Sequence, residues 1–478
     1  MSDPILDREA LDECLRLAAG EAARYLAGVD NALVRPPQPV DDVHGVAGAL
    51  PDEGIGSLEA LRTLIDATDA AATRSAGPRF FHFVMGGGTP AALAADWLTS
   101  AVDQIAFNWV SSPLAMRLEQ ISVDWLKELF ELPAGWSGVL TTGATTANFT
   151  GLAAARRWWG QQHGVDVEEH GLSELPPMPV LASGYVHASA IKALAMLGIG
   201  RQHVRTFADD ETSALDADAL DRALRELGGA PAVLIATAGD VNTGRFDPIA
   251  VMAELAHEHG AWLHVDGAFG LFAAVSPSTR QLVSGIERAH SVAVDGHKWL
   301  NVPYDCGAAF VHDPEIHRGA FTASAAYLGR EDSDRPVFSN LAPEMSRRAR
   351  AFVVWATLAA YGRSGYRSMV ERHVELARRL AEHVAAEAEL ELLADVPLNV
   401  VCFRYRPPGV GEDELDELNR RLGEAVLEDG RVYFGTTVVG GKIAFRPAIV
   451  NWRTRREDVD AIVPTVLELG ASLIPARI

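Results

Sequence analysis

The chain has 478 residues, with 64 acidic against 42 basic side chains and a formal net charge of -22 at pH 7. Nucleic acids and anionic membranes are bound by clustered Lys and Arg, so this charge predicts neither as a partner. The hydrophobic content of 48% and the charged content of 22% are typical of a soluble globular protein. The length predicts two or more lobes rather than one hydrophobic core.

The cysteines and the N-terminus predict a cytoplasmic protein. Cys14, Cys306 and Cys402 are far apart and match no metal-binding pattern. Such a sparse, odd set is typical of a reducing compartment rather than of a disulfide framework. The acidic N-terminus lacks the apolar core of a signal peptide, and no apolar run approaches the ~20 residues that cross a bilayer. The glycosylation sequon at Asn148 is therefore interpreted as chance.

Residues 1–79 are predicted to form a helical arm. Apolar residues follow helical spacing over 6–26, the Pro-rich stretch 35–39 breaks the pattern, and a second helix is predicted at 57–72. A helix followed by an extended Pro-rich stretch has little core of its own. Such an arm packs on another lobe or on another subunit.

Residues 80–355 are predicted to form a large α/β domain. Short apolar runs alternate with helical stretches, which is the pattern of a mainly parallel sheet covered by helices on both faces. The predicted strands cover residues 138–142, 179–182, 232–236, 261–266 and 291–295. Ligands of such sheets bind at the carboxyl ends of the strands, so the polar residues there are the candidate site.

Residues 356–478 are predicted to form a small C-terminal α+β domain. A long helix near 344–388 leads into it, and shorter alternating segments follow at 398–405 and 442–445. A last helix is predicted from about Arg456. No internal repeat and no low-complexity tract interrupts this order.

The first candidate site follows the strand at 138–142. Gly143, Ala144 and Thr145 form a turn of small residues that leads into a predicted helix. Free N–H groups and the helix dipole at such a turn would bind a phosphate. Threonine is also an ordinary N-cap residue, so helix capping alone explains the turn equally well. No Gly-Lys-Ser/Thr sequence follows, which excludes a Walker loop.

Asp266 and Lys298 lie at the ends of two further strands. A carboxylate that ends a buried strand caps a helix or pairs with a donor, such as the nitrogen of a heterocycle. Burial of Lys298 would lower the pKa of its amine toward imine-forming chemistry, although a lysine at a strand end is commonly a surface residue. A phosphate turn, a carboxylate and an amine at successive strand ends together predict a site for pyridoxal 5'-phosphate.

These motifs resemble those of the group II pyridoxal-phosphate decarboxylases, the family of aromatic-amino-acid, glutamate and cysteine-sulfinate decarboxylases. The most specific parts are His264-Val-Asp-Gly-Ala268 and Asp295-Gly-His-Lys-Trp299, and the resemblance extends from Phe80 into the small domain. It implies the fold of type I pyridoxal-phosphate aminotransferases. It also implies an enzyme that decarboxylates an L-amino acid to the amine and carbon dioxide.

The resemblance implies a role for each candidate residue. Lys298 would form the imine with the cofactor, and Asp266 would pair with the pyridine nitrogen. His187 would stack over the ring, although a satisfied core histidine is the alternative for this residue. The remaining implied cofactor contacts are Gly143, Ala144, Thr145, Thr237, Ala268 and His297. Of the whole set, Lys298, His187 and Asp266 are expected to be catalytic, and no residue is expected to bind a metal.

Two features depart from the family pattern. Asp295 stands where many relatives have Asn, and a carboxylate beside a phosphate is unfavourable unless it is screened or faces elsewhere. In the aromatic-amino-acid branch a loop tyrosine protonates the substrate carbon. The segment 327–345 has its only tyrosine at Tyr327, at its start, and carries Phe338 nearer the middle. Phenylalanine at the tyrosine position resembles relatives that form an aldehyde oxidatively, so both outcomes stay open.

The substrate pocket is also predicted by resemblance. Residues 78–83, Asn108-Trp109 and Ser112-Pro113 resemble the family region that lines the pocket, and aromatic walls favour an aromatic substrate. Packing between lobes explains them almost equally well. Arg79 is the candidate clamp for an acidic side chain. Arg446 and Asn451 resemble positions where relatives approach the substrate side, but a structural role is the alternative and they are left out of the candidate site.

Several alternatives in function remain. A carbon–carbon lyase or an aminotransferase could use the same Lys298, Asp266 and His187. The chain could also be a catalytically inactive cofactor-binding subunit, or an unrelated nucleotide-binding enzyme that uses the Gly143 turn. The N-terminal arm resembles the segment that wraps a partner subunit in this family, which implies a symmetric homodimer.

Overall fold

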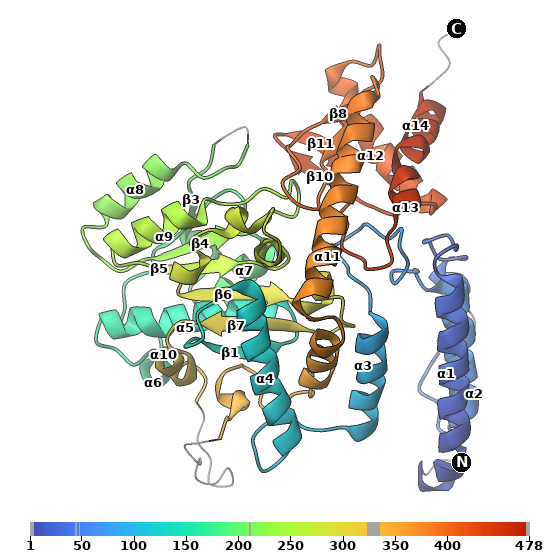
Figure 1. The fold of residues 1–478 in the computed structure, drawn as a ribbon, viewed down its shortest axis with the longest axis horizontal. Helices are drawn as coiled ribbons and strands as arrows, with labels where there is room; N and C mark the ends of the chain where they lie inside the picture. Colours follow the sequence, from blue (N-terminus) through green and yellow to red (C-terminus); the bar gives the residue numbers. More distant parts are fainter. Residues whose placement is uncertain (1–3, 44, 47, 210–211, 323–334, 475–478) are drawn as a thin grey trace.

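A seven-stranded sheet forms the centre of the computed structural model, which describes residues 4–43, 45–46, 48–209, 212–322 and 335–474. The strand order is β1-β7-β6-β5-β4-β2-β3, and only β7 runs against its neighbours in this sheet (Figure 1). The strands are β1 (Ser137–Thr141), β2 (Val180–Ala182), β3 (Val204–Thr206), β4 (Val233–Thr237), β5 (Trp262–Asp266), β6 (Ser291–Asp295) and β7 (Gly307–Val311). The predicted mainly parallel sheet is confirmed.

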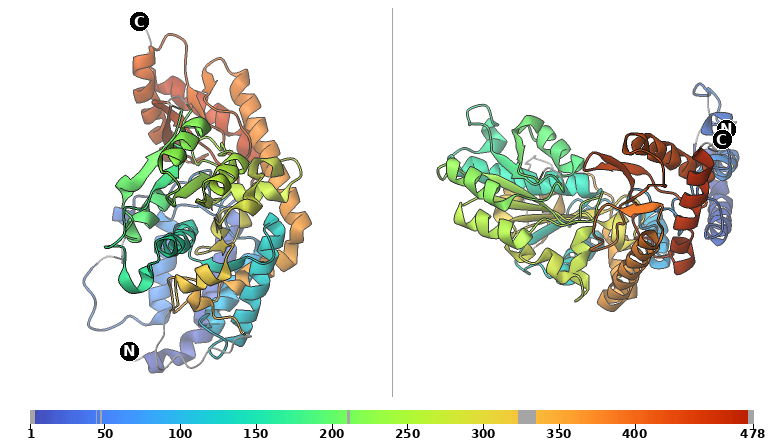
Figure 2. Two further views of the ribbon diagram at one scale, coloured as in Figure 1. Left: turned by 90° about the vertical axis from the view of Figure 1, so that its left-hand side faces the viewer. Right: turned by 90° about the horizontal axis from the view of Figure 1, so that it is seen from above.

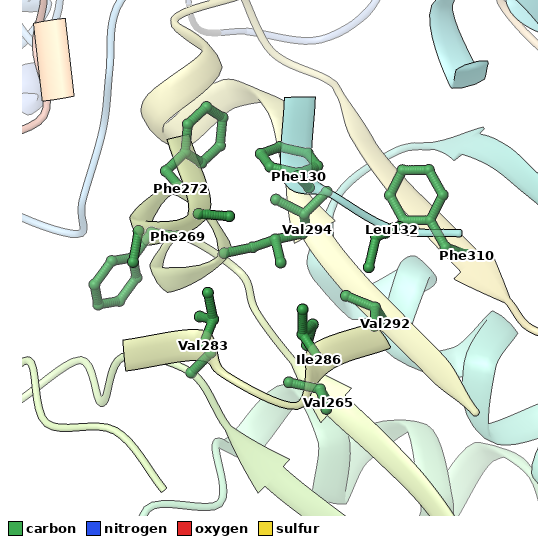
Figure 3. Close-up of a cluster of buried hydrophobic side chains, with 14 of the residues drawn as sticks. Phe130, Leu132, Val265, Phe269, Phe272, Val283, Ile286, Val292, Val294 and Phe310 are labelled. Carbon is green, nitrogen blue, oxygen red and sulfur yellow. The ribbon is translucent and has the colours of Figure 1, made fainter. Parts of the chain in front are cut away.

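Both faces of this sheet are buried because neighbouring strand residues point to opposite sides. In β4, Leu234 packs into one hydrophobic cluster and Val233 into another. Figure 3 shows part of the first cluster, where Phe130, Phe272 and Val294 pack together. The helices on this face are α4 (Pro113–Phe130), α8 (Ala217–Glu226), α9 (Ile249–Glu258) and the first half of α11 (Ala351–Ala386). The second face is covered by α5 (Ala144–Gln162) and α7 (Ala188–Met196).

A smaller antiparallel sheet lies at the C-terminal end of the chain, in the order β10-β11-β9-β8. Its strands are β8 (Leu390–Leu392), β9 (Phe403–Tyr405), β10 (Thr436–Val439) and β11 (Lys442–Phe445). The second half of α11 packs on it with α12 (Glu412–Asp429), α13 (Arg456–Asp460) and α14 (Ile462–Leu473). The prediction of a small α+β unit after the large sheet is therefore confirmed. Its exact boundary stays a prediction, because α11 belongs to both units.

The N-terminal helices α1 (Leu11–Gly28) and α2 (Ser57–Ala71) pair with each other at one side of the molecule (Figures 1 and 2). Neither helix contains a buried residue. The next helix, α3 (Pro90–Val102), packs on α11 and lines a groove together with α1 and α2. The pair has little core of its own.

The remaining helices are short. Two are α-helical, α6 (Val167–His170) and α10 (Pro314–Gly319). The 3-10 helices are Pro4–Ala10, Val40–Asp42, Arg201–His203, Gly270–Val275, Arg280–Val283, Ile286–Arg288 and Phe338–Asn340, and Gly296–Leu300 forms a π-helical turn. In the part of the chain that the structure describes, no helix combines the length and the apolar character needed to span a membrane.

Candidate active site

A cavity of about 330 Å³ opens at the carboxyl ends of the central strands. Its walls contain all nine residues that the sequence predicted to contact a cofactor: Gly143, Ala144, Thr145, His187, Thr237, Asp266, Ala268, His297 and Lys298. The strand register brings them together, since Thr237 ends β4 directly beside Asp266 at the end of β5. The volume is that of a site for a small organic molecule.

Lys298 extends into this cavity from the π-helical turn that follows β6. π-helical turns are rare and are frequently found at functional sites. Its Nζ lies 2.9 Å from Oδ2 of Asp295, and the ring of Phe269 lies 5.8 Å away. The side chain is 16% exposed. The amine is thus held at the cavity wall by a buried carboxylate and remains accessible to a small molecule.

The turn at Gly143 brings the N-terminus of α5 against Asp295. The Ala144 N–H donates to Oδ1 of Asp295, whose side chain is almost fully buried. Gly143 has φ 154°, and a Cβ there would lie 3.0 Å from Cε1 of His297. Only glycine leaves this space free. Asp295, which the sequence marked as a departure from the family, therefore lies between the helix N-terminus and the lysine.

Asp266 is a buried carboxylate that receives hydrogen bonds from neutral groups. Its Oδ1 accepts from the Ala268 N–H at 3.1 Å, and its Oδ2 accepts from Nδ2 of Asn148 at 2.8 Å. The residue is 3% exposed, and no ion pair to it is found among the described residues. A protonated ring nitrogen in the cavity would supply the positive partner that a buried carboxylate needs.

His187 is the N-cap of α7, and its orientation is fixed by the start of that helix. Its Nδ1 accepts from the Ser189 N–H at 3.2 Å and lies 2.8 Å from Ser189 Oγ. Because Nδ1 is an acceptor, the ring proton is on Nε2. Burial lowers the pKa of His187 below its ordinary value, which favours the neutral ring.

His297 lies on the other side of Asp295. Its Nε2 is 3.3 Å from Oδ1 of Asp295, and its ring stacks on Tyr304 with a centroid distance of 4.0 Å. Burial lowers the pKa of His297. Its buried Nδ1 has no hydrogen-bond partner within the described parts of the chain. An orphaned buried nitrogen beside a helix N-terminus fits a site completed by a bound anion.

The residues present therefore fit pyridoxal phosphate. The Ala144 N–H of the turn already bonds to Asp295, so the phosphate could be held by Thr145 at the start of α5 and by His297. Asp266 could hold the ring nitrogen. Lys298 could reach the aldehyde, while His187 and Ala268 line the intervening space.

Only some of the residues predicted to line the substrate pocket lie at the cavity. Phe83 lines the cavity and is 60% exposed, whereas Trp109 and Ser112 do not line it. Arg79 is not placed as a clamp, because its Nε lies 3.6 Å from Oδ1 of Asp458 and it does not line the cavity. The carboxylate of Asp458, in α13, holds this guanidinium at the interface with the small sheet.

The aldehyde-forming alternative depends on two residues of the segment 327–345. Tyr327 lies outside the described residues. Phe338 is 4% exposed and packs in a hydrophobic cluster with Met116 and Val139 instead of lining the cavity. The position of Phe338 in this structure therefore gives no support to a role beside the substrate.

Sequence reasoning missed several residues of the cavity wall. They are Thr142, Thr146, Tyr185, Ser189, Gly239, Val241, Phe269 and Tyr304. Thr142 and Thr146 flank the predicted turn, and Ser189 is two residues from His187, so closeness to a predicted residue was an available signal. Tyr304 is placed by a fold of the chain after the π-helical turn, which no local pattern indicates.

The fold and the cavity thus define the class of a pyridoxal-phosphate enzyme built on an α/β sheet. Residues 61–406 match the model of the pyridoxal-dependent decarboxylase conserved domain. The chain is 32% identical over 445 residues to a tyrosine decarboxylase of Oryza sativa subsp. japonica, covering 87% of this chain and 82% of that protein. It is 32% identical over 415 residues to the acidic amino acid decarboxylase GADL1 of Mus musculus, covering 83% and 74%.

Among solved structures, Catharanthus roseus tryptophan decarboxylase in complex with L-tryptophan is similar, with a TM-score of 0.84 and 26% identity. The alignment covers 98% of this chain and 99% of that one. The chain belongs to the pyridoxal-dependent decarboxylase family, the group II family that the sequence motifs resemble. It is a pyridoxal-phosphate-dependent carboxy-lyase, and its cofactor is pyridoxal 5'-phosphate.

Proposed function

We propose that the chain decarboxylates an aromatic L-amino acid to the amine and carbon dioxide, with Lys298 as the covalent anchor of the cofactor. The observation that carries this proposal is the presence of the Lys298 amine, the Asp266 carboxylate and the Gly143 turn in one cavity. When bound, pyridoxal phosphate supplies the electron sink for the bond that breaks.

The side chains of the cavity would have different roles. Asp266 would hold a proton on the ring nitrogen and so keep that sink positively charged. Lys298, whose Nζ lies at the cavity wall, could also hold or move a proton there. The neutral ring of His187 would cover one face of the cofactor and orient the substrate.

An aromatic substrate is proposed because of the charge and shape of the cavity. Among its described lining residues, Lys298 is the only lysine or arginine. An acidic side chain would need a second cation, and Arg79 is engaged elsewhere. Phe83, Val241 and Tyr304 provide apolar and aromatic surface instead.

The test is a panel of L-amino acids with added pyridoxal phosphate, in which carbon dioxide, amine, aldehyde and hydrogen peroxide are measured together. Carbon dioxide and amine are expected in equal amounts, with the highest rate on an aromatic substrate. Stoichiometric aldehyde and peroxide would contradict simple decarboxylation. Keto-acid-dependent turnover without carbon dioxide would indicate an aminotransferase, and inactivity across the panel would indicate a cofactor-binding subunit.

We further propose that the protein is a symmetric homodimer. Large apolar side chains are exposed on α1 to α4 and the turns between them: Leu11, Leu15, Leu64, Trp97, Leu98, Val102, Ile105, Val110 and Leu114. An apolar groove lined by α1, α2 and α3 lies within this surface. Large exposed apolar patches are rare on monomeric proteins, and a second copy would cover these side chains.

Light scattering on the purified chain is expected to give twice the mass of 51.3 kDa. The reason is the hydrophobic free energy gained when the arm is covered. Replacing Trp97 and Leu98 with serine should shift the protein toward the monomer, whereas Val251→Ser, at an exposed position on α9 outside the arm and the groove, should not. A monomeric wild-type protein at micromolar concentration would contradict the proposal.

A cytoplasmic location is proposed on the state of the cysteines. Cys14, Cys306 and Cys402 are all free thiols in the structure. Cys306 and Cys402 are buried, and burial raises the pKa of each thiol to about 12. Unpaired thiols are typical of a reducing compartment.

A further inference from the structure

A line of buried polar side chains leads from the sheet to Asp266. Nε1 of Trp262 lies 3.0 Å from Oγ of Ser291, which lies 2.8 Å from Nδ1 of His264. Nε2 of His264 lies 2.9 Å from Oδ1 of Asn148, and Nδ2 of Asn148 lies 2.8 Å from Oδ2 of Asp266. The first four side chains are fully buried. Together they form a continuous hydrogen-bonded relay that ends at the cavity.

The alternation of the strands explains why these residues meet. Trp262, His264 and Asp266 occupy alternate positions of β5, so they point to the same face of the sheet. His264 is the register partner of Ser291 on β6. Asn148 comes from α5, which covers this face, and is four residues after Ala144.

The distances favour one direction for the hydrogen bonds of the relay. The indole of Trp262 can only donate, so Oγ of Ser291 accepts. At 2.8 Å, Nδ1 of His264 is the nearer of the two acceptors for the hydrogen of that hydroxyl. His264 then carries its proton on Nε2 and donates it to Oδ1 of Asn148. The amide group that faces Asp266 is therefore the NH2 group, which donates to the carboxylate.

His264 stays neutral in this arrangement. Burial lowers the pKa of His264 to about 4, so near pH 7 the ring carries one proton. Its position depends on Gly151 of α5, because a Cβ there would lie 2.8 Å from Nδ1 of His264. The Gly151 carbonyl lies 3.5 Å from Oγ of Ser291, too far to compete well for the hydroxyl hydrogen.

The same amide also reaches His187. Nδ2 of Asn148 lies 3.1 Å from Oγ of Ser189, and that hydroxyl lies 2.8 Å from Nδ1 of His187. One hydrogen of the amide is directed to Asp266 and the other to Ser189. Asn148 thus connects the proposed partner of the ring nitrogen with the proposed stacking histidine.

We propose that Asn148 is a positioning residue, whose amide is oriented by Trp262, Ser291 and His264 so that Asp266 stays an unprotonated acceptor for the cofactor ring. With the amide reversed, two oxygens would face each other 2.8 Å apart, and Asp266 would need a proton to fill the gap. A protonated Asp266 could not accept from a pyridinium. The inference rests on the proposed function, since it takes Asp266 as the partner of the ring nitrogen.

The test compares three full-length holoenzymes loaded with cofactor that is labelled with ¹⁵N in the ring. Asn148→Leu removes the amide, and Ser291→Ala removes the hydroxyl that sets the direction of the relay. Thr150→Val is the matched control, because Thr150 is buried in α5 and its hydroxyl donates to the Thr146 carbonyl of its own helix. The ring-nitrogen chemical shift reports protonation independently of activity.

In Asn148→Leu the nitrogen shift is expected to move toward the unprotonated value, with kcat lowered about tenfold or more, as for a lost hydrogen bond to a charged group. Ser291→Ala should change the nitrogen shift and kcat in the same direction but by a smaller amount, although Ser291 does not line the cavity. Thr150→Val should leave both at the wild-type value. Wild-type shifts in folded Asn148→Leu and Ser291→Ala would overturn the inference.

Two further measurements separate this inference from the proposed function. If the ring nitrogen stays protonated in Asp266→Asn, the role of Asp266 itself is refuted. If it loses its proton in Asp266→Asn but keeps it in Asn148→Leu and Ser291→Ala, only the relay is refuted. If Asn148→Leu does not fold, selective ¹⁵N labelling of histidine in the wild-type chain decides the matter. The His264 signals are assigned as those that disappear in His264→Gln. They are expected to show a proton on Nε2, and a proton on Nδ1 would overturn the relay.

Discussion

Replacing Lys298 with alanine is expected to lower amine formation on the order of 10⁴-fold, because both the covalent anchor and a proton carrier are lost. It should also remove the visible absorbance that the holoenzyme retains after free cofactor is separated. The expectation follows from the position of Nζ in the cavity, 2.9 Å from Asp295. Absorbance spectra and carbon dioxide release measure the two effects on the same samples.

Lys192→Ala is the matched control, because Lys192 is an exposed lysine on α7 that does not line the cavity. It should bind cofactor and turn over like the wild type. A Lys298→Ala protein with the wild-type visible spectrum would show that another amine holds the cofactor.

Asp266→Ala is expected to keep the covalent capture of the cofactor but to lower kcat on the order of 10²- to 10³-fold, the usual loss when a preorganised charge is removed. The physical reason is that the ring nitrogen would lose its proton and the sink its positive charge. The measurements are the rate of carbon dioxide release and the visible spectrum of each variant.

Asp266→Asn keeps the shape of the side chain and should show a similar loss of rate, which separates charge from packing. Asp221→Asn is the control, since Asp221 forms a surface ion pair with Arg225 and is remote from the cavity. Full turnover in Asp266→Ala would rule out the proposed role of this carboxylate.

The central strands could be predicted because their sequences carry a strong signal. β4, β5 and β6 are completely buried runs rich in Val, Leu and Ile. β7, Gly-Ala-Ala-Phe-Val, was not predicted, since Gly and Ala have low strand propensity and the strand depends on its neighbours. β3 (Val-Arg-Thr) and β8 (Leu-Glu-Leu) are short and have a charged residue at the centre, so no apolar run marks them.

Helix ends were harder to predict where distant residues determine them. The long helix was expected from about 344 but begins at Ala351. Before it, Arg347 is buried against Glu119 of α4 with Nη2 2.6 Å from Oε1, and Arg350 pairs with Asp305. Glu119 and Asp305 lie far away in sequence, so the local pattern could not reveal that these ion pairs hold residues 347–350 outside the helix.

The candidate site could be predicted from the sequence for a different reason. Parallel strands all end at the same edge, so residues at successive strand ends meet whatever the details of packing. The pairing of Lys298 with Asp295 and the stacking of Tyr304 on His297 depend on distances that no spacing encodes. Asn148 offered one signal, since it is four residues after Ala144 and lies on the same side of the helix as that turn.

The helix α11 has a consequence for how the molecule can fold and evolve. Its first half contributes Val354 and Leu358 to the cluster on the large sheet, and its second half contributes Leu376 and Leu380 to the cluster on the small one. Gly362, with φ 57°, bends the helix within the part that packs on the large sheet, since Tyr366 and Val374 also belong to that cluster. Both clusters contain side chains of this one segment, so the two units share it. Exchange of the small unit between relatives would therefore have to carry its half of α11 along.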